Sequence, residues 1–385
     1  MPERARVALL VHTASDWSRS VLQGVAEFSR RHGPWEIFVE ARGFQERPRL
    51  PRGWKGDGII ARLTDPQLQR SIRLASLPAV NVSWLGRHTT STPQVVSDQE
   101  ACGRLAAEHF LERGYAQYAY AGPLQHLGYE DQLGQRFAQS LAEAGHECEQ
   151  FLPGSPTRRT SVYAQRQKLQ QWLLRLPRRV ALLAWNSEVG REVATLCHSN
   201  GLRVPEDIAL LCVEHDGLMS DLSPTSLSSI DQSPGDVGYA AAELLQKMMN
   251  GAPAPDQPIL IPPAGVVQRR SSEHYAVSDA IVAKALELID QECDGPLKVG
   301  DLSDRLSISR RNLELRFHAA VSCAPAEQIR RIRLERAKRL LLESTLTVAQ
   351  VAEKTGFQGS EVFIRNFKNK FSMPPGEYRS EFKAD

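Results

Sequence analysis

The sequence lacks the long apolar runs, the charge excess and the leader that would direct it to a membrane or out of the cell. No apolar run approaches the ~20 residues of a membrane-spanning helix, and the early apolar stretch over 7–11 is too short for a signal peptide. Charges nearly cancel, with 47 Lys and Arg against 45 Asp and Glu, a net charge of +2. We therefore expect a cytoplasmic protein with no membrane partner.

Cysteine is scarce, and the motifs of common enzyme classes are missing. The six cysteines are widely spaced and form no C-x-x-C pair, so we expect free thiols, no metal and no cofactor. There is no GxSxG, P-loop or HExxH, and no GxGxxG after a strand. An enzyme is the weaker alternative, because only His12, His126 and His215 near predicted strand ends are loose candidates for acid–base chemistry.

Residues 6 to about 270 alternate short apolar runs with amphipathic stretches. The predicted strands are 7–12, 35–40, 58–61, 79–83, 95–97, 118–121, 180–185 and 208–213. The helical stretches are 18–32, 100–113, 131–144, 162–176, 188–199 and 236–249. Most strands are continuous apolar runs, which indicates parallel sheets buried on both faces. The pattern predicts an α/β fold built from βαβ units, in two lobes.

Prolines crowd the end of this region, and beyond about residue 278 the strand pattern gives way to helices. We predict an α/β domain over 1–270, a linker over 271–280 and an all-helical domain over 281–385. Within the α/β domain, one lobe takes about 1–115 and 235–252, and the other about 116–232 and 253–270. Residues 296–385 hold 17 basic and 11 acidic residues, a net charge of +6, which suits nucleic-acid binding or an ordinary solvated surface.

The helical part contains a weak internal repeat. Residues 301–309 resemble 350–358, and Leu313 and Phe317 recur fifty positions later as Phe363 and Phe367. Each copy reads as a short helix, a turn and a second helix, which is the helix-turn-helix plan. The long helix over 326–343 between the copies would pack both into one block.

The second helix of each copy carries polar residues that suit DNA binding, because Arg, Asn and Glu contact base edges whereas Ser and Lys hold phosphates. In the first copy these are Ser309, which also suits an N-cap, Arg310, Arg311, Asn312, Glu314 and Arg316. In the second copy they are Ser360, Glu361, Arg365, Asn366 and Lys368. The arginines of the connecting helix, at 330, 331, 333, 336 and 339, suit phosphate contact or simple solvation.

The tail resembles the AraC/XylS DNA-binding domain. The resemblance rests on residues 333–341, 351–357 and 375–379 together with the phenylalanines of the second copy. It implies two helix-turn-helix units that bind neighbouring major grooves of a double-stranded DNA operator, with RNA polymerase as a further partner. Ser322 and Ser372 stand where that family usually has glycine.

The front part resembles the effector domain of the LacI/GalR regulators, which is similar to periplasmic sugar-binding proteins. The residues that carry the match are 98–110, 121–123, 185–187, 204–209 and 211–216. The sensor precedes the DNA-binding part here, an order that resembles the XylR-like regulators of bacterial xylose operons. The resemblance implies a homodimer with a small sugar effector, xylose or a related monosaccharide, and activation of sugar-catabolism genes.

Sugar pockets combine carboxylates, amides and an aromatic face, and open α/β sheets bind ligands beyond the carboxyl ends of their strands. The ligand-binding candidates are Asp16, Trp17, Arg19, Asp98, Tyr129, Asn186 and Glu214. Asn186 and Glu214 fall where the LacI resemblance places a polar amide and an acid on the sugar. The alternatives are packing for Trp17, loop hydrogen bonding for Asn186 and helix capping for Asp98.

Two departures from the LacI pattern leave the identity of the sugar open. Leu133 stands where an arginine is common, and Ser187 stands where an aspartate is common. We predict a sequence-specific DNA-binding transcriptional regulator controlled by a small sugar. The alternatives are a regulator with a non-sugar ligand or none, a transport binding protein, and an enzyme on the α/β scaffold.

Overall fold

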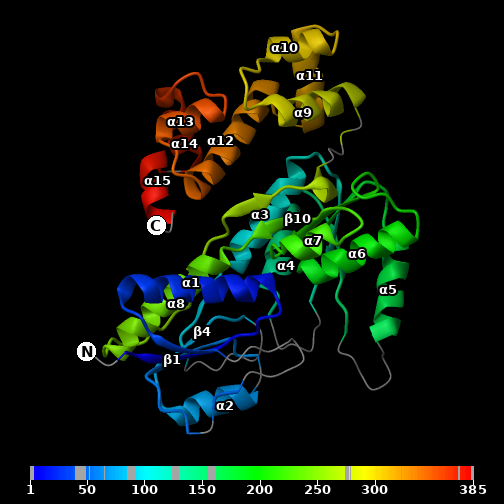
Figure 1. Cartoon of the computed structure of the whole chain (residues 1–385). Helices are drawn as coiled ribbons and strands as arrows, with labels where there is room; N and C mark the ends of the chain where they lie inside the picture. Colours follow the sequence, from blue (N-terminus) through cyan, green and yellow to red (C-terminus); the bar gives the residue numbers. More distant parts are fainter. Residues whose placement is uncertain are drawn as a thin grey trace. The chain divides into compact units, whose positions relative to one another are not determined.

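The chain forms two units, which the computed structural model describes over most of their length (Figure 1). The described residues are 4–39, 49–51, 53–64, 66–84, 92–123, 130–154, 162–273, 277, 279–321, 323–371 and 373–382. The sensor unit comprises Met1–His109 and Gln117–His274, and the C-terminal unit comprises Phe110–Ala116 and Tyr275–Asp385. The predicted class, an α/β part followed by an all-helical part, is confirmed. Among the described residues, no helix has the length and apolarity to span a membrane.

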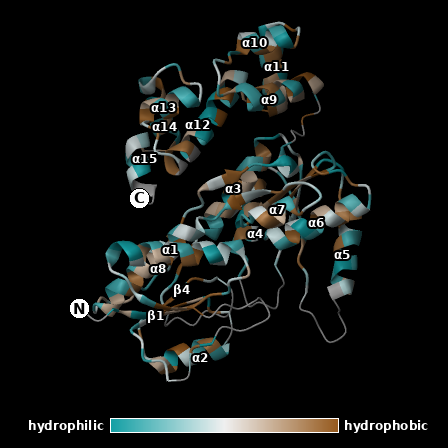
Figure 2. Cartoon of the chain, viewed as in Figure 1, coloured by the Kyte–Doolittle hydropathy of each residue, from teal (hydrophilic) through white to brown (hydrophobic). Residues whose placement is uncertain are grey.

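The first sheet of the sensor unit is a parallel four-stranded sheet in the order β2-β1-β3-β4. Its strands are β1 (Arg6–Leu10), β2 (Glu36–Val39), β3 (Gly58–Ala61) and β4 (Ala79–Asn81). The helices packed with it are α1 (Asp16–His32), α2 (Pro66–Ala75) and α8 (Pro234–Met249). Buried aliphatic side chains of α1 and α8 join those of the strands in one core, as expected for strands buried on both faces. Figure 2 shows hydrophobic colouring along β1 and β4.

The second sheet has six strands in the order β12-β10-β9-β8-β6-β7, and its described pairings are parallel except for β12 with β10. Its strands are β6 (Gln117–Ala121), β7 (Cys148–Phe151), β8 (Val180–Ala184), β9 (Ile208–Val213), β10 (Ser228–Asp231) and β12 (Gly265–Val267). The helices of this part are α3 (Gln99–Leu111), α4 (Gln132–Glu143), α5 (Val162–Arg175), α6 (Ser187–Ser199) and α7 (Gly217–Asp221).

Three chain segments cross between the two sheets and are tied to one another. Strand β5 (Val95–Ser97) pairs in parallel with β11 (Ile259–Ile261). The Ser97 hydroxyl donates to the carbonyl of Gln232 at 2.9 Å, and the Ser233 hydroxyl donates to the carbonyl of Pro262 at 2.9 Å. Because the crossing segments bond to each other, the two sheets of the sensor are joined by one compact hinge.

All eight predicted strands are present, but four others escaped prediction. Strand β7 is an edge strand with two exposed residues, and β10 begins with two serines, so neither forms an apolar run. Strands β11 and β12 have three residues each and lie in the proline-rich stretch read only as extended chain. Helix α2 was also missed.

The C-terminal unit consists of helices around two cores. Its helices are α9 (Ala280–Glu292), α10 (Val299–Arg305), α11 (Arg310–Val321), α12 (Pro325–Glu343), α13 (Val348–Lys354), α14 (Ser360–Phe371) and α15 (Pro375–Phe382). Leu313 and Phe317 lie in one core, and Phe363 and Phe367 lie in the other. Helix α12 contributes to both cores, as predicted for the connecting helix. Ser322 and Ser372, which stand where the AraC/XylS family usually has glycine, lie outside the described residues.

Residues 110–116, the link from α3 to β6, pack with the C-terminal unit. The Glu112 carboxylate forms an ion pair with Arg331 of α12 at 3.1 Å. Gly114 has a left-handed φ of 72°, and a Cβ built there would lie 3.2 Å from Val277. Glycine suits both the backbone conformation and this close approach.

Candidate ligand site and nucleic-acid interface

A cationic side chain and an aromatic ring meet where β1 and β3 end. Arg62 directly follows β3, and Trp17 lies in the first turn of α1. The guanidinium carbon of Arg62 lies 5.1 Å from the centre of the Trp17 ring, within the range of a cation–π contact. The Nε atom of Arg62 is buried and has no hydrogen-bond partner. Such a donor is costly to bury, so the site suits a ligand that accepts a hydrogen bond.

Glu214 supplies the opposite charge from the end of β9. Burial raises the pKa of its carboxyl group to about 7, the nearby Arg62 charge opposes that shift, and the acids Asp216, Glu188 and Asp16 add to it. Burial lowers the pKa of the Arg62 guanidinium, and Glu214 opposes that shift in turn. This mutual influence indicates that the predicted residues Asp16 and Glu214 lie near Arg62, which itself contacts the ring of Trp17.

Sequence reasoning missed Arg62. The available signal was its position, because a charged residue that directly follows a buried parallel strand lies at the edge where ligands bind. The apolar run over 58–61 was assigned correctly, but the residue after it was not considered.

The conformation of Glu214 is held by the first residue of α6. Glu214 has a φ of 84°, in the region that residues with a side chain rarely adopt. The Ser187 hydroxyl donates to the Glu214 carbonyl at 2.6 Å. Ser187, the departure from the LacI pattern, thus positions the backbone of the acid.

Other predicted ligand residues already have local partners. Arg19 donates to the Asp16 carboxylate at 3.2 Å and to the carbonyl of Thr13 at 3.1 Å. The Asn186 side-chain oxygen caps α6 by accepting from Val189 N at 2.9 Å, which leaves its amide hydrogens for a ligand. Asp98 caps α3 by accepting from Ala101 N at 2.8 Å. Tyr129 lies outside the described residues.

Leu133, His12 and His215 are further sensor residues named from the sequence, and each packs against or bonds with the sensor's own residues. Leu133 is fully buried in the core, so an apolar contact stands where LacI-like proteins often have an arginine. His12 is buried, and His215 Nδ1 lies 2.8 Å from the Ser229 hydroxyl. His126 lies outside the described residues.

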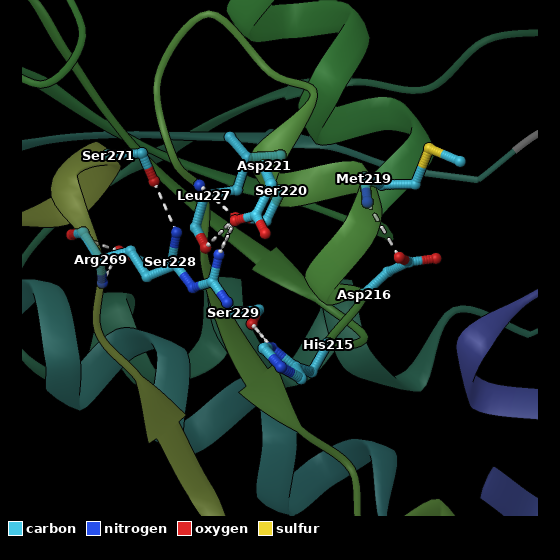
Figure 3. A network of polar contacts seen from close by, with 10 residues as sticks. All are labelled: His215, Asp216, Met219, Ser220, Asp221, Leu227, Ser228, Ser229, Arg269 and Ser271. Atoms are coloured by element: carbon cyan, nitrogen blue, oxygen red, sulfur yellow. Dashed lines mark hydrogen bonds and ion pairs between the residues drawn. The ribbon is translucent and has the colours of Figure 1, made fainter.

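The chain after Glu214 enters a polar network (Figure 3). Asp216 caps α7 by accepting from Met219 N at 3.0 Å. Arg269 donates to Ser220 at 2.8 Å and to Asp221 at 2.7 Å. Ser271 of the adjoining 3₁₀ turn accepts from Ser228 N of β10 at 2.8 Å. The network ties α7 and its flanking loop to β10 and to the 3₁₀ turn that follows β12.

In the first helix-turn-helix unit, α11 buries Leu313 and Phe317 and exposes most of its polar residues. Ser309 accepts from Asn312 N at 3.3 Å, which confirms its capping role. Arg310 forms an ion pair with Glu314 at 2.8 Å. Arg316 stays partly exposed and forms an ion pair at 3.5 Å with the Asp279 carboxylate, which precedes α9.

In the second unit, α14 buries Phe363 and Phe367 and leaves Glu361, Arg365 and Lys368 exposed. Asn366 is half-buried, and its side-chain amide donates to the carbonyl of Val362 in its own helix at 2.7 Å. This contact uses one of the two amide hydrogens of Asn366, and its predicted role at the DNA stays a prediction.

Three arginines of α12 bind inside the C-terminal unit. Arg333 donates to the carbonyls of Cys293 and Gly295, each at 2.7 Å. Arg336 forms an ion pair with Asp294 at 2.7 Å, and Arg331 pairs with Glu112. These side chains hold helices together, whereas Arg330 is exposed. The side chain at 339 lies outside the described residues.

Comparisons with known proteins match each part of this architecture. Residues 6–97 match the XylR N-terminal domain, 107–272 a periplasmic binding protein-like domain, and 302–381 a helix-turn-helix domain. The xylose operon regulatory protein of Escherichia coli K12 is 29% identical over 98% of this chain and 97% of its own length. Its Haemophilus influenzae counterpart is 29% identical over 97% of this chain and 98% of its own. A structure of the xylose-binding transcription activator XylR aligns over 100% of both chains, with a TM-score of 0.63 and 27% identity.

The fold, the paired helix-turn-helix units and these matches define a DNA-binding transcriptional regulator with a periplasmic-binding-protein-like sensor. More particularly, the chain is similar over nearly its whole length to the XylR-like regulators, in which the sensor precedes an AraC-type DNA-binding domain.

Proposed function

We propose that this protein is a transcriptional activator controlled by a small sugar bound between the two sheets of its sensor. The observation that carries the proposal is the cluster of Trp17, Arg62 and Glu214. An aromatic face suits the C–H side of a sugar, and buried charged groups suit its hydroxyls. The unpartnered Nε of Arg62 supports a ligand that completes the hydrogen bonding.

The proposed effector is D-xylose or a related monosaccharide. Support comes from the match to the XylR N-terminal domain and from relatives named as xylose operon regulators. Asn186 joins the proposed site through its amide, and Asp16, Arg19, Asp98 and Tyr129 stay predictions. A regulator with a non-sugar ligand, or with none, is the alternative that the ligand screen below addresses.

We propose that a homodimer binds the operator and that the activated complex contacts RNA polymerase in the cytoplasm. A dimer is supported by Leu218 of α7 and Leu222 at the C-cap of that helix, which lie one turn apart and are 60% and 66% exposed. Exposed leucines so placed favour burial against another surface.

We keep the proposed boundaries of a sensor over 1–270, a linker over 271–280 and a DNA-binding domain over 281–385. No catalytic step is assigned to the sensor.

The test is a thermal-shift screen of the full chain against D-xylose, other pentoses and hexoses. A ligand at ~100 times its Kd stabilises the native state by ~2.7 kcal/mol, which is measurable. We expect a selective shift that is reduced in Glu214→Gln and kept in Glu243→Gln, a variant of a half-exposed acid on α8. A selective hit on another sugar would revise the effector, and no shift with any sugar would favour the alternative reading.

A further inference from the structure

The two helix-turn-helix units present different chemistry at equivalent positions. Leu313 and Phe363 occupy matching core positions, as do Phe317 and Phe367. On this register Asn312 of α11 corresponds to Val362 of α14, and Leu315 corresponds to Arg365. Each helix therefore has one apolar and one hydrogen-bonding side chain at these two sites, in opposite order.

These sites lie on the exposed side of each helix. Leu315 is 64% exposed and Val362 is 43% exposed, and Asn312 and Arg365 are also exposed. Residues three apart on a helix are neighbours on its surface, so the apolar and the polar side chain of each pair lie together. These exposed side chains point away from the buried residues that anchor each helix in its core, which are Leu313 and Phe317 in α11 and Phe363 and Phe367 in α14.

Exposure alone does not assign a role, because Leu74 on α2 is 73% exposed. The distinguishing feature of Leu315 is its surroundings on α11. It lines a shallow hollow with Arg311, Glu314, His318, Ala319 and Ala324. The Glu314 carboxylate is ion-paired with Arg310, so the remaining cation and the histidine beside an apolar floor suit a polyanion that also offers apolar groups.

The major groove of DNA offers such a surface, because the C5-methyl group of thymine projects into it beside base acceptors and phosphates. We propose that Leu315 and Val362 contact thymine methyl groups in the two half-sites of the operator. Their partners Asn312 and Arg365 bind the neighbouring purine, adenine for asparagine and guanine for arginine. The two half-sites therefore differ in sequence, and the order of thymine and purine is reversed between them. This inference rests on the function proposed above.

The experiment begins with the full chain and a pool of randomised double-stranded DNA. After sequences are enriched, each thymine of the consensus is replaced singly by deoxyuridine, which removes only the methyl group. For each bound protomer we expect two thymines, one for each helix-turn-helix unit, at which the replacement weakens binding about fourfold, the effect of burying one methyl-sized group. At one thymine the penalty disappears in Leu315→Ala, and at the other it disappears in Val362→Ala. The control Leu174→Ala, on α5 of the sensor, keeps both penalties.

A gain-of-function variant gives an independent readout. Leu315→Arg puts into α11 the side chain that α14 has at the matching position, and we expect it to shift preference in the first half-site from thymine toward guanine. Thermal unfolding of each variant should match that of the parent, because both positions are exposed.

Two different failures are distinguishable. An enriched consensus with no deoxyuridine penalty at any thymine, or with penalties that persist in both alanine variants, overturns the inference and leaves the proposed function standing. Failure of the full chain to enrich any sequence, with and without D-xylose, overturns sequence-specific DNA binding and the inference together.

Discussion

Glu214 combines a charge, an unusual backbone conformation and a position beside Arg62 in one residue. Sugar hydroxyls donate to a carboxylate and so favour its ionised form. Because the pKa of the free site is raised to about 7, ligand binding must release a proton at pH 6 and not at pH 8.

We therefore expect ligand affinity to rise about tenfold from pH 6 to pH 8, which is the change in ionised fraction for a group with that pKa. Isothermal titration calorimetry in two buffers of different ionisation enthalpy would report the proton release. Glu214→Gln should bind more weakly, with no pH dependence. Affinity that falls as the pH rises would mean that the protonated acid binds the ligand.

Arg333 shows that the number of arginines in a helix overstates how many of them are available to contact DNA. It donates to the carbonyls of Cys293 and Gly295, which a glycine and proline turn leaves open after α9. Hydrogen bonds that involve a charged group contribute about 2 kcal/mol each when partly buried.

Arg333→Ala should therefore lower the free energy of unfolding of the C-terminal unit by about 2 kcal/mol or more. Chemical denaturation followed by a probe in that unit would measure the loss. Arg330→Ala is the matched control on the same helix, because its side chain is exposed. Equal losses in the two variants would contradict the assigned contacts.

At the scale of elements, α1 and α8 approach each other through two glycines. A Cβ at Gly24 would lie 1.9 Å from the carbonyl oxygen of Gly235, and one at Gly238 would lie 1.9 Å from that of Val21. Both clashes are with backbone, so the helices would have to separate. Small residues at these positions thus set how closely the two helices pack.

We expect Gly24→Ala and Gly238→Ala each to destabilise the sensor by about 1–3 kcal/mol, the usual cost of overpacking. Thermal unfolding of the full chain would show it. Gly235→Ala in the same pair of helices is the control, because a Cβ there meets no atom within 4 Å. If all three variants unfold at the same temperature, the close approach of the helices does not restrict the side chains allowed at Gly24 and Gly238.

The elements were largely predictable because their signal is local. Continuous apolar runs predicted the buried strands, and the spacing of Leu313 and Phe317 predicted α11. What escaped prediction depends on contacts distant in sequence. Helical periodicity predicts the exposed position of Arg316, but only the fold brings its ion-pair partner Asp279 beside it. The position of Arg62 after a buried strand is a local signal, but its nearness to Glu214 depends on the fold.

At the scale of the whole molecule, the charge of the C-terminal region should govern DNA affinity. Binding of the full chain to its operator should weaken steeply as salt rises, because phosphate contacts release counterions. Lys368→Ala should reduce the slope of log K against log salt by about one, whereas Arg365→Ala should relax base preference. Lys370→Ala is the control, since Lys370 pairs with Glu335 at 2.9 Å. Filter binding over a salt series would measure all three, and a flat response would exclude phosphate contacts.

The link over 110–116 packs with the C-terminal unit, while the chain on both sides of it belongs to the sensor. The backbone therefore passes between the units three times, at 109–110, 116–117 and 274–275. A fragment cut at residue 278 would lack Glu112, the partner of Arg331, and the glycine turn beside Val277. Dissection by truncation would thus remove part of the excised unit's own packing. The two units are better separated by point substitutions than by a stop codon.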